Sequence, residues 1–305
     1  MVKRLISLTY SEIEKLSSRE LLEAIALSEG RTFAAECVCS VPPLLSDITN
    51  AEAVSSLSAD FVILNMFDAL EPYIGGLPKC EKKETIRTLK KLIGRPVCIN
   101  LEPVEPGEGT ESLWTMSRGR MATAENARTA REMGVDMINI TGNPGNNVTN
   151  EAIVKAIREI RNDLKDDIII IAGKMHASGS ISEAGERIID IKTIDEFIDA
   201  GADIIMIPSP GTIPGITVEY AHELISHIHS RGKLALTAIG TSQEGADVDT
   251  IRRIALNCKM AGADIHHIGD SGYVGMALPE NILAYSIAIR GARHTYHKIG
   301  QSVNR

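Results

Sequence analysis

Apolar runs recur along the chain, and four of them follow the same small turn that ends in aspartate. A run of strand length comes directly after each aspartate, and in three copies a glycine stands two residues before it. Glycine is the residue that most readily takes the left-handed conformation at the end of a helix. Each copy therefore predicts a helix end, a short loop and a buried strand. The aspartates are Asp60, Asp136, Asp203 and Asp264, and the strands cover 61–64, 137–140, 204–207 and 265–268.

Four more apolar runs lie between these copies, at 33–39, 96–101, 168–172 and 234–239. Some are apolar at every position, which is typical of parallel strands buried on both faces. Eight such strands with helix-length spacers predict an α/β fold, the (β/α)8 TIM barrel, which usually takes about 250 residues. We therefore expect one domain over 1–305, with the barrel at 31–291 and a C-terminal tail at 292–305.

An N-terminal helical extension, residues 1–30, precedes the first predicted strand. Ser11 with Glu14, and Ser17 with Glu20, each match the capping box in which a serine is followed three residues later by glutamate. An apolar stripe over 21–27 follows the second box. The pattern predicts a helix that lies across the bottom of the barrel.

Loops after the predicted strands are long, whereas the turns that enter the strands are short. In TIM barrels the carboxyl ends of the strands carry the active site. Side chains alternate along a strand, so counting from each repeated aspartate gives the residues that face inward. The alternative is a structural network in which these groups bond one another. The predicted inner rim consists of Glu36, Asn65, Asn100, Glu102, Asn139, Thr141, Lys174, His176 and His267.

Lys174 is the sharpest catalytic candidate on this rim. A lysine that burial keeps neutral can attack a carbonyl group and form a Schiff base. Glu102, Glu36 or His176 could then carry protons. The same lysine could instead stay charged and pair with a carboxylate or a substrate phosphate.

Phosphate binding is predicted for the loops after the seventh and eighth strands, because TIM barrels often hold phosphate there. Both loops are rich in glycine, hydroxyls and free backbone amides, and the alternative is that the glycines serve tight turns only. Asp270 is an awkward neighbour for a phosphate and suits a metal or a sugar hydroxyl better. The candidate substrate-binding residues here are Gly240, Thr241, Ser242, Gly269, Ser271 and Gly272, in addition to Asn65, Asn100, Asn139, Thr141 and His267.

A divalent metal such as Mg or Zn is the rival interpretation of the same residues. Glu36, Glu102, His176, His267 and Asp270 are suitable ligand types. They lie on different strands, so no local ligand spacing tests the idea. His266 and His267 are adjacent, so only one of them can point into the barrel. The identity of any cofactor stays open.

Composition limits the kinds of partner and the cellular location that we expect for the protein. The net charge of −8 argues against general nucleic-acid binding. No apolar run reaches the length of a membrane span, and the N-terminus lacks the apolar core of a signal peptide. The five cysteines show no CxxC spacing and are expected to be reduced. These features predict a cytoplasmic protein with a small-molecule partner, and homo-oligomerisation is left open.

The stretches 241–247 and 261–270 resemble an uncharacterised bacterial family of single-domain TIM-barrel proteins, and more remotely phosphate-binding and phosphonomutase-like barrels. That resemblance implies the fold and a cytoplasmic location but assigns no catalytic residue. Together with the rim, it leads us to expect an enzyme of the lyase or isomerase type that acts on a small, anionic carbonyl compound, phosphorylated or carboxylated. The alternatives are a metal-dependent lyase or hydrolase on similar substrates, and a barrel that binds a metabolite without turnover.

Overall fold

Eight parallel strands form a closed barrel in the computed structural model, which describes residues 2–104, 116–142, 148–176, 184–271 and 274–305. The strands pair in chain order, and the eighth closes the ring by pairing with the first. The predicted TIM barrel is therefore confirmed, and the predicted strand bounds differ from the observed ones by no more than one residue at either end. The strands are β1 (Thr32–Val38), β2 (Phe61–Asn65), β3 (Val97–Leu101), β4 (Met137–Ile140), β5 (Ile169–Gly173), β6 (Ile204–Pro208), β7 (Leu234–Ile239) and β8 (Ile265–Ile268).

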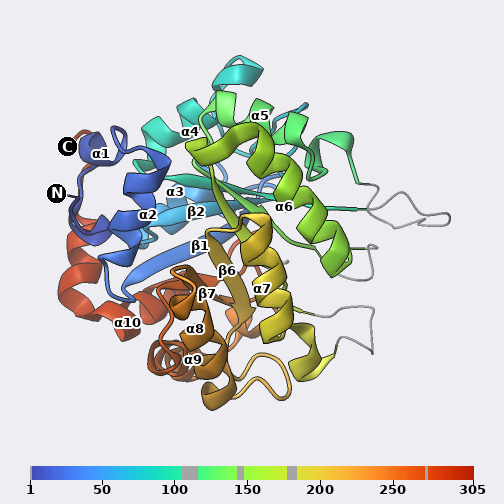
Figure 1. The fold of residues 1–305 in the computed structure, drawn as a ribbon. Helices are drawn as coiled ribbons and strands as arrows, with labels where there is room; N and C mark the ends of the chain where they lie inside the picture. Colours follow the sequence, from blue (N-terminus) through green and yellow to red (C-terminus); the bar gives the residue numbers. More distant parts are fainter. Residues whose placement is uncertain (1, 105–115, 143–147, 177–183, 272–273) are drawn as a thin grey trace.

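Helices surround the barrel and connect one strand to the next (Figure 1). Their apolar faces pack on the outward-facing side chains of the strands, which form the larger hydrophobic cluster. Glycine in the left-handed conformation ends four of them, and the repeated turn predicts three of these ends, at Gly134, Gly201 and Gly262. The helices are α1 (Tyr10–Ile13), α2 (Ser18–Ala26), α3 (Asn50–Ser56), α4 (Thr85–Ile93), α5 (Ala124–Met133), α6 (Asn150–Leu164), α7 (Ile191–Ala200), α8 (Val218–Ser230), α9 (Val248–Ala261) and α10 (Pro279–Ile299).

The four repeated aspartates tie the strands together in pairs. Each one precedes an even-numbered strand and bonds the same residue of the preceding odd-numbered strand twice. Its backbone N–H donates to that residue's carbonyl oxygen at 2.7 to 3.0 Å, and its carboxylate accepts that residue's N–H at 2.8 to 3.0 Å. The repeat is thus a clamp at the bottom of each strand pair. The pairs are Asp60 with Phe33, Asp136 with Val97, Asp203 with Ile170, and Asp264 with Ala235.

The N-terminal segment closes the bottom of the barrel. Apolar side chains of α2 and of the residues before it pack in one cluster with the inward-facing side chains of the strands, among them Ile63, Met137 and Met206. The capping box at Ser17 and Glu20 is present. The first predicted box was placed wrongly, because α1 begins at Tyr10 and its box consists of Thr9 and Glu12.

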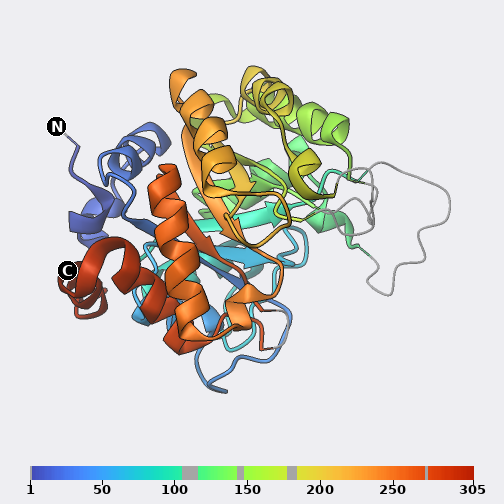
Figure 2. The same ribbon diagram turned by 90° about the horizontal axis from the view of Figure 1, so that it is seen from below.

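Both chain termini lie at this closed end, as the two views show (Figures 1 and 2). The backbone N–H of Ser11 donates to the carbonyl oxygen of Arg305 at 3.0 Å. Most of the predicted C-terminal tail is helical, because α10 continues to Ile299 across a kink at Gly291, where φ is 75°. Within the described part of the chain, no helix has the length and apolar character needed to cross a membrane.

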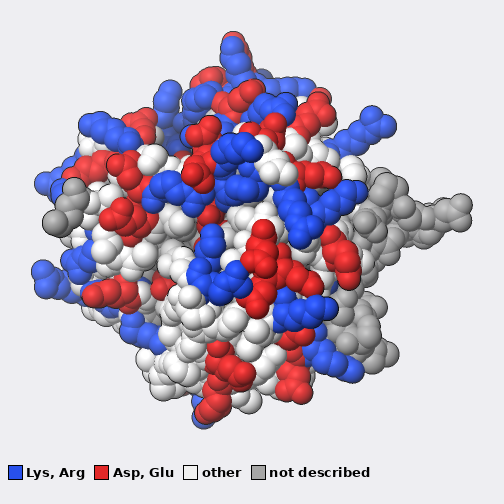
Figure 3. Space-filling model, in the orientation of Figure 1, with Lys and Arg blue, Asp and Glu red and all other residues white. Residues whose placement is uncertain are grey.

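Surface charges of both signs are mixed over the face shown in Figure 3. Lysine and arginine side chains alternate there with aspartate and glutamate. Elsewhere on the surface, ion pairs such as Arg128 with Asp163 join the two kinds of charge. No large field of one sign dominates this face.

Candidate active site

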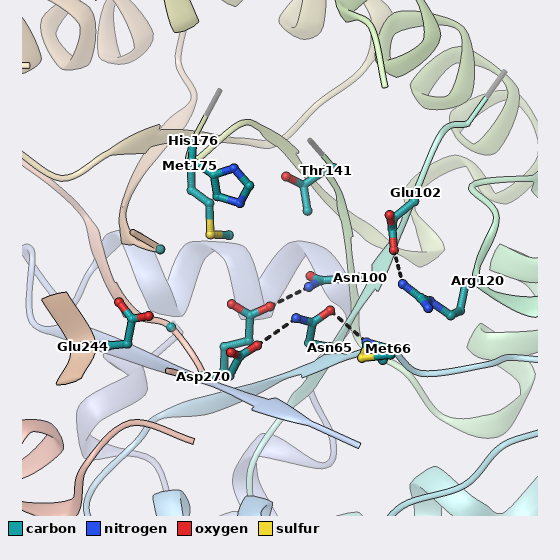
Figure 4. Close-up of a pocket in the computed structure, with 14 residues that line it drawn as sticks. Asn65, Met66, Asn100, Glu102, Arg120, Thr141, Met175, His176, Glu244 and Asp270 are labelled. Carbon is teal, nitrogen blue, oxygen red and sulfur yellow. Dashed lines mark hydrogen bonds and ion pairs between the residues drawn. The ribbon is translucent and has the colours of Figure 1, made fainter. Parts of the chain in front are cut away.

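A pocket of about 390 Å³ opens at the carboxyl ends of the strands, opposite the closed end of the barrel. Its wall is strongly polar, and most of its residues come from the last position of a strand or from the loop that follows (Figure 4). This is where TIM barrels carry their active sites. The described residues that line it are Glu36, Asn65, Met66, Asn100, Glu102, Arg120, Thr141, Gly142, Met175, His176, Gly240, Glu244, Gly269 and Asp270.

Glu36 is the centre of a buried hydrogen-bond network at the floor of the pocket. The side-chain amide of Asn100 donates to Glu36 Oε1 at 2.6 Å, and Nε2 of His267 lies 3.1 Å from Glu36 Oε2. Asn139 in turn donates to Asn100 Oδ1 at 2.8 Å. Glu36 and Asn100 reach the pocket, whereas Asn139 and His267 lie behind them and are not among its described lining residues. The network explains how a carboxylate can be buried inside the barrel.

The two adjacent histidines of β8 point to opposite faces, in agreement with the alternation of a strand. His267 contacts Glu36 inside the barrel. His266 lies outside, where its Nε2 is 3.1 Å from the carbonyl oxygen of Gly30 and its ring packs near Tyr285. Burial lowers the pKa of His266 to about 3, so this histidine is a neutral core residue.

Two further polar pairs form the rim of the pocket. Asn65, the last residue of β2, donates from its side-chain amide to Asp270 Oδ2 at 2.8 Å. Across the pocket, Arg120 forms an ion pair with Glu102 (Figure 4). The backbone also joins these two residues, because the Glu102 N–H donates to the Arg120 carbonyl oxygen at 2.9 Å.

Glu244 is the buried carboxylate of the loop after β7. It is 6% exposed and lines the pocket, and its Oε2 has no hydrogen-bond partner among the described residues. Burial raises the pKa of Glu244, and the nearby carboxylates of Asp270 and Glu36 raise it further, whereas its own backbone amide and His267 act in the opposite direction. These influences favour the protonated acid. The side chain points into the pocket from the same side as Asp270 (Figure 4).

Asn281 of α10 holds the backbone on which Glu244 stands. Its side-chain amide donates to the carbonyl oxygens of Glu244 at 2.9 Å and of Ala246 at 2.8 Å. Asn281 is fully buried. The turn that carries Glu244 is therefore fixed from beneath by the C-terminal helix.

His176 lines the pocket from the loop after β5. Burial lowers the pKa of its imidazole, and the negative charge of Glu36 opposes that shift. The lowered pKa favours a neutral ring, which can accept a proton.

Lys174 is not part of the described pocket wall, although the predicted alternation put it on the same face as His176. It is 1% exposed. The alternation fails there because β5 ends at Gly173, so Met175 and His176 both reach the wall. A Schiff base at Lys174 stays a prediction.

The predicted phosphate loops contribute two glycines to the wall, Gly240 and Gly269. Their hydroxyl residues are absent from the described lining. Thr241 Oγ1 bonds the carbonyl oxygen of Thr212 at 2.9 Å and Gln243 Oε1 at 2.6 Å, and Ser271 Oγ donates to the carbonyl oxygen of Met276 at 2.8 Å. Ser242 takes a left-handed conformation with φ at 79°, and Gly272 lies outside the described residues.

A metal centre does not fit the described side chains. The candidate ligands are each engaged with another protein group: Glu36 with His267, Glu102 with Arg120, and Asp270 with Asn65. Within the described ranges, no three His, Cys, Asp or Glu side chains are placed so that they could hold a metal ion. We therefore derive no chemical step through a metal.

Several wall residues are absent from the predicted set. Glu244 is the clearest, since the loop after β7 attracted attention only for its glycine and hydroxyls. The only sign of Glu244 in the sequence was that its carboxylate follows the end of β7 by a few residues. Arg120 and Met175 come from longer loops, and nothing in the local pattern shows that they reach the pocket.

The closed parallel barrel with a polar pocket at the carboxyl ends of its strands defines this chain as a TIM-barrel protein. It belongs to the family described as a domain of unknown function, DUF7916, whose model matches residues 6–305. The predicted resemblance to an uncharacterised family of such barrels is thereby confirmed. Among curated proteins, none matches the chain.

Solved structures that share the fold include the following two. One is 2,3-dimethylmalate lyase, a member of the PEP mutase/isocitrate lyase superfamily, with 16% identity, a TM-score of 0.51, and coverage of 83% of this chain and 80% of the other. The second is titled a "putative phosphonomutase from Burkholderia cenocepacia J2315", with 17% identity, a TM-score of 0.51, and coverage of 83% and 93%. At such identities the likeness shows the fold alone.

Proposed function

We propose that this protein is an enzyme of the lyase or isomerase type that moves protons on a small carbonyl compound bound in the pocket. The observation that carries the proposal is that Glu244 and His176 line one pocket with oppositely perturbed environments. Burial favours the protonated acid at Glu244 and the neutral base at His176. Two titratable groups whose pKa values are displaced in this way are suited to be a general acid and a general base.

The proposed step is the removal of a proton from the carbon next to the substrate carbonyl. His176 accepts that proton, and the electron pair of the broken C–H bond moves to form a C=C bond while the carbonyl oxygen takes the proton of Glu244. The substrate carries a hydroxyl on that carbon, so the product of this step is an enediol. In an isomerisation, protonated His176 returns its proton to the former carbonyl carbon, and the Glu244 carboxylate takes the proton of the neighbouring hydroxyl. In a lyase reaction, a hydroxyl on the next carbon leaves as water with the proton of His176, and the Glu244 carboxylate takes back the enediol proton. No redox partner is needed.

The remaining wall residues would orient the substrate. Asn65, Asn100 and Thr141 present amide and hydroxyl groups to the pocket, and Glu36 and Asp270 present carboxylate oxygens. Two solved structures with this fold are titled as a lyase and a putative phosphonomutase, so lyase or isomerase chemistry is compatible with the fold. Lys174 has no role in this scheme.

The test is proton exchange with solvent. Purified protein is incubated in D2O with small hydroxy-carbonyl compounds, and NMR follows loss of the proton next to the carbonyl. We expect exchange to fall by about 100-fold or more in Glu244→Gln and in His176→Asn, because general acids and bases typically contribute that much. Glu223→Gln, on the exposed face of α8, is the matched control and should exchange like the wild type.

Exchange at the wild-type rate in both pocket variants would refute the assignment of acid and base. If compounds raise the melting temperature but undergo no exchange or conversion, the protein is a binding barrel rather than an enzyme. Loss of exchange in Lys174→Met, with exchange retained in both pocket variants, would favour the Schiff-base prediction over this assignment.

A further inference from the structure

The pocket has more negative than positive groups in its described lining. Four carboxylates contribute to it, and Arg120 is the single Lys or Arg among the described lining residues. Arg120 is already paired with Glu102. The stretches outside the described residues contain no Lys or Arg in the sequence, so they have no basic side chain to supply. The described wall therefore offers no uncommitted guanidinium or ammonium group to an anionic ligand.

The part of the wall beside the predicted phosphate loops is acidic as well. Gly240 and Gly269 are accompanied in the wall by Glu244 and Asp270. The carboxyl carbon of Glu244 lies 3.7 Å from where a Cβ on Gly269 would be. A phosphate at these glycines would therefore lie close to carboxyl groups. The protonated acid at Glu244 carries no charge, so the repulsion comes from Asp270, and at the dielectric of a partly buried site one like charge weakens binding by about tenfold or more.

Glu244 is the side chain in the described wall that a bound ligand would best complement. Its side chain is more than nine-tenths buried, it points into the pocket, and its Oε2 has no partner among the described residues. A buried polar atom without a hydrogen bond is costly, and a bound molecule would remove that cost. A hydroxyl is the best complement, because it can accept a hydrogen bond from the protonated acid and donate one to a neighbouring carboxylate.

We propose that the pocket takes an uncharged, polyhydroxylated carbonyl compound, a free sugar, rather than a phosphate ester or a carboxylate. The proposal rests on the proposed function and specifies its substrate class. The wall places acceptors beside donors, as recognition of neighbouring hydroxyls requires: the amides of Asn65 and Asn100 give one hydrogen each to Asp270 and Glu36, respectively, and an amide NH2 group has a second hydrogen to donate. A cavity of about 390 Å³ lies at the small end of ligand pockets, which suits a compound of this size.

The test compares matched probes by ligand-observed NMR and calorimetry at neutral pH. The pairs are ribose with ribose 5-phosphate and glucose with glucose 6-phosphate, and glucosamine adds a cationic member. We expect at least one free sugar to bind, and its phosphate ester to bind about tenfold more weakly or worse. Tighter binding of either ester or of glucosamine, or no binding of any free sugar, overturns the proposal.

Variants separate charge from shape. Asp270→Asn removes one negative charge and nearly preserves the size of the side chain, so it should narrow the gap between sugar and ester at least threefold. Glu223→Gln, remote from the pocket, should leave the gap unchanged. An unchanged gap in Asp270→Asn would count against electrostatic exclusion of the ester. Asp270→Ser is a second variant for the same comparison if the amide variant does not fold.

The two proposals fail in different ways. If phosphate esters bind more tightly and exchange their protons in a manner that depends on Glu244, the substrate class is wrong and the acid–base function stands. If free sugars bind as expected but none exchanges a proton, the substrate class stands and the catalytic proposal is wrong.

Discussion

The buried lysine at the end of α10 should make the free energy of unfolding depend on pH. Lys298 is 1% exposed, and its Nζ lies 3.5 Å from Asp60 Oδ1. Asp60 is already paired with Arg290, and Arg95 is buried in the same cluster. Three cations therefore surround one carboxylate at the closed end of the barrel. The pKa of Lys298 is lowered to about 7, chiefly by burial and to a lesser extent by the charges of Arg95 and Arg290, and Asp60 opposes this shift.

The sign of the pH effect follows from where the proton is bound. An unfolded lysine keeps its proton up to a pKa of about 10.4. Between pH 7 and that value the unfolded chain binds more protons at Lys298 than the folded protein does, so the free energy of unfolding rises with pH. The slope approaches about 1.4 kcal/mol per pH unit, which gives a gain of about 2 kcal/mol between pH 7 and pH 9.

The assay is urea unfolding of the wild type and of Lys298→Met over this pH range. Methionine keeps most of the volume and has no proton to lose, so its unfolding free energy should lack the gain of about 2 kcal/mol. Groups common to both proteins cancel in the difference. Lys91→Met, at an exposed position of α4, is the matched control and should follow the wild type. Parallel pH profiles for the wild type and Lys298→Met would refute the reasoning.

Three further substitutions test other parts of the structure. Asp203→Ala removes a strand clamp and leaves Arg161 without its buried partner, so urea unfolding should show a loss of about 3–5 kcal/mol, and a loss below 1 kcal/mol would contradict the clamp. Asn281→Ala removes both hydrogen bonds that hold the Glu244 turn. Proton exchange should therefore slow and its pH profile should shift, while circular dichroism shows that the protein stays folded. An unchanged pH profile would mean that Asn281 does not position the acid. Gly173→Ala would put a methyl group 2.0 Å from a carbonyl oxygen of the neighbouring strand, so a loss of more than about 1 kcal/mol is expected, and a neutral effect would show that β5 can shift.

Strand alternation predicted part of the pocket wall, and the described wall residues that it missed lie beyond the ends of the strands. Asn65, Asn100 and Glu36 lie within strands, so counting along the strand placed them on the inner face. Lys174 comes after the last residue of β5, where the chain no longer alternates. Glu244 lies in a loop whose path depends on Asn281, a residue far along the chain. The pattern of residues around Glu244 in the sequence cannot predict a contact with a residue so far along the chain.

The sequence by itself determined the barrel, the order of its strands and the end at which the pocket lies, because these depend on apolar periodicity and on turns that act within a few residues. It also showed the four repeated aspartates. Only the tertiary structure decided what those aspartates do, since each clamps a strand that precedes it by a whole helix. The same holds for the chemistry of the pocket. The perturbed acid at Glu244 depends on burial and on the nearby carboxylates of Asp270 and Glu36, and closure of the barrel alone brings these groups together.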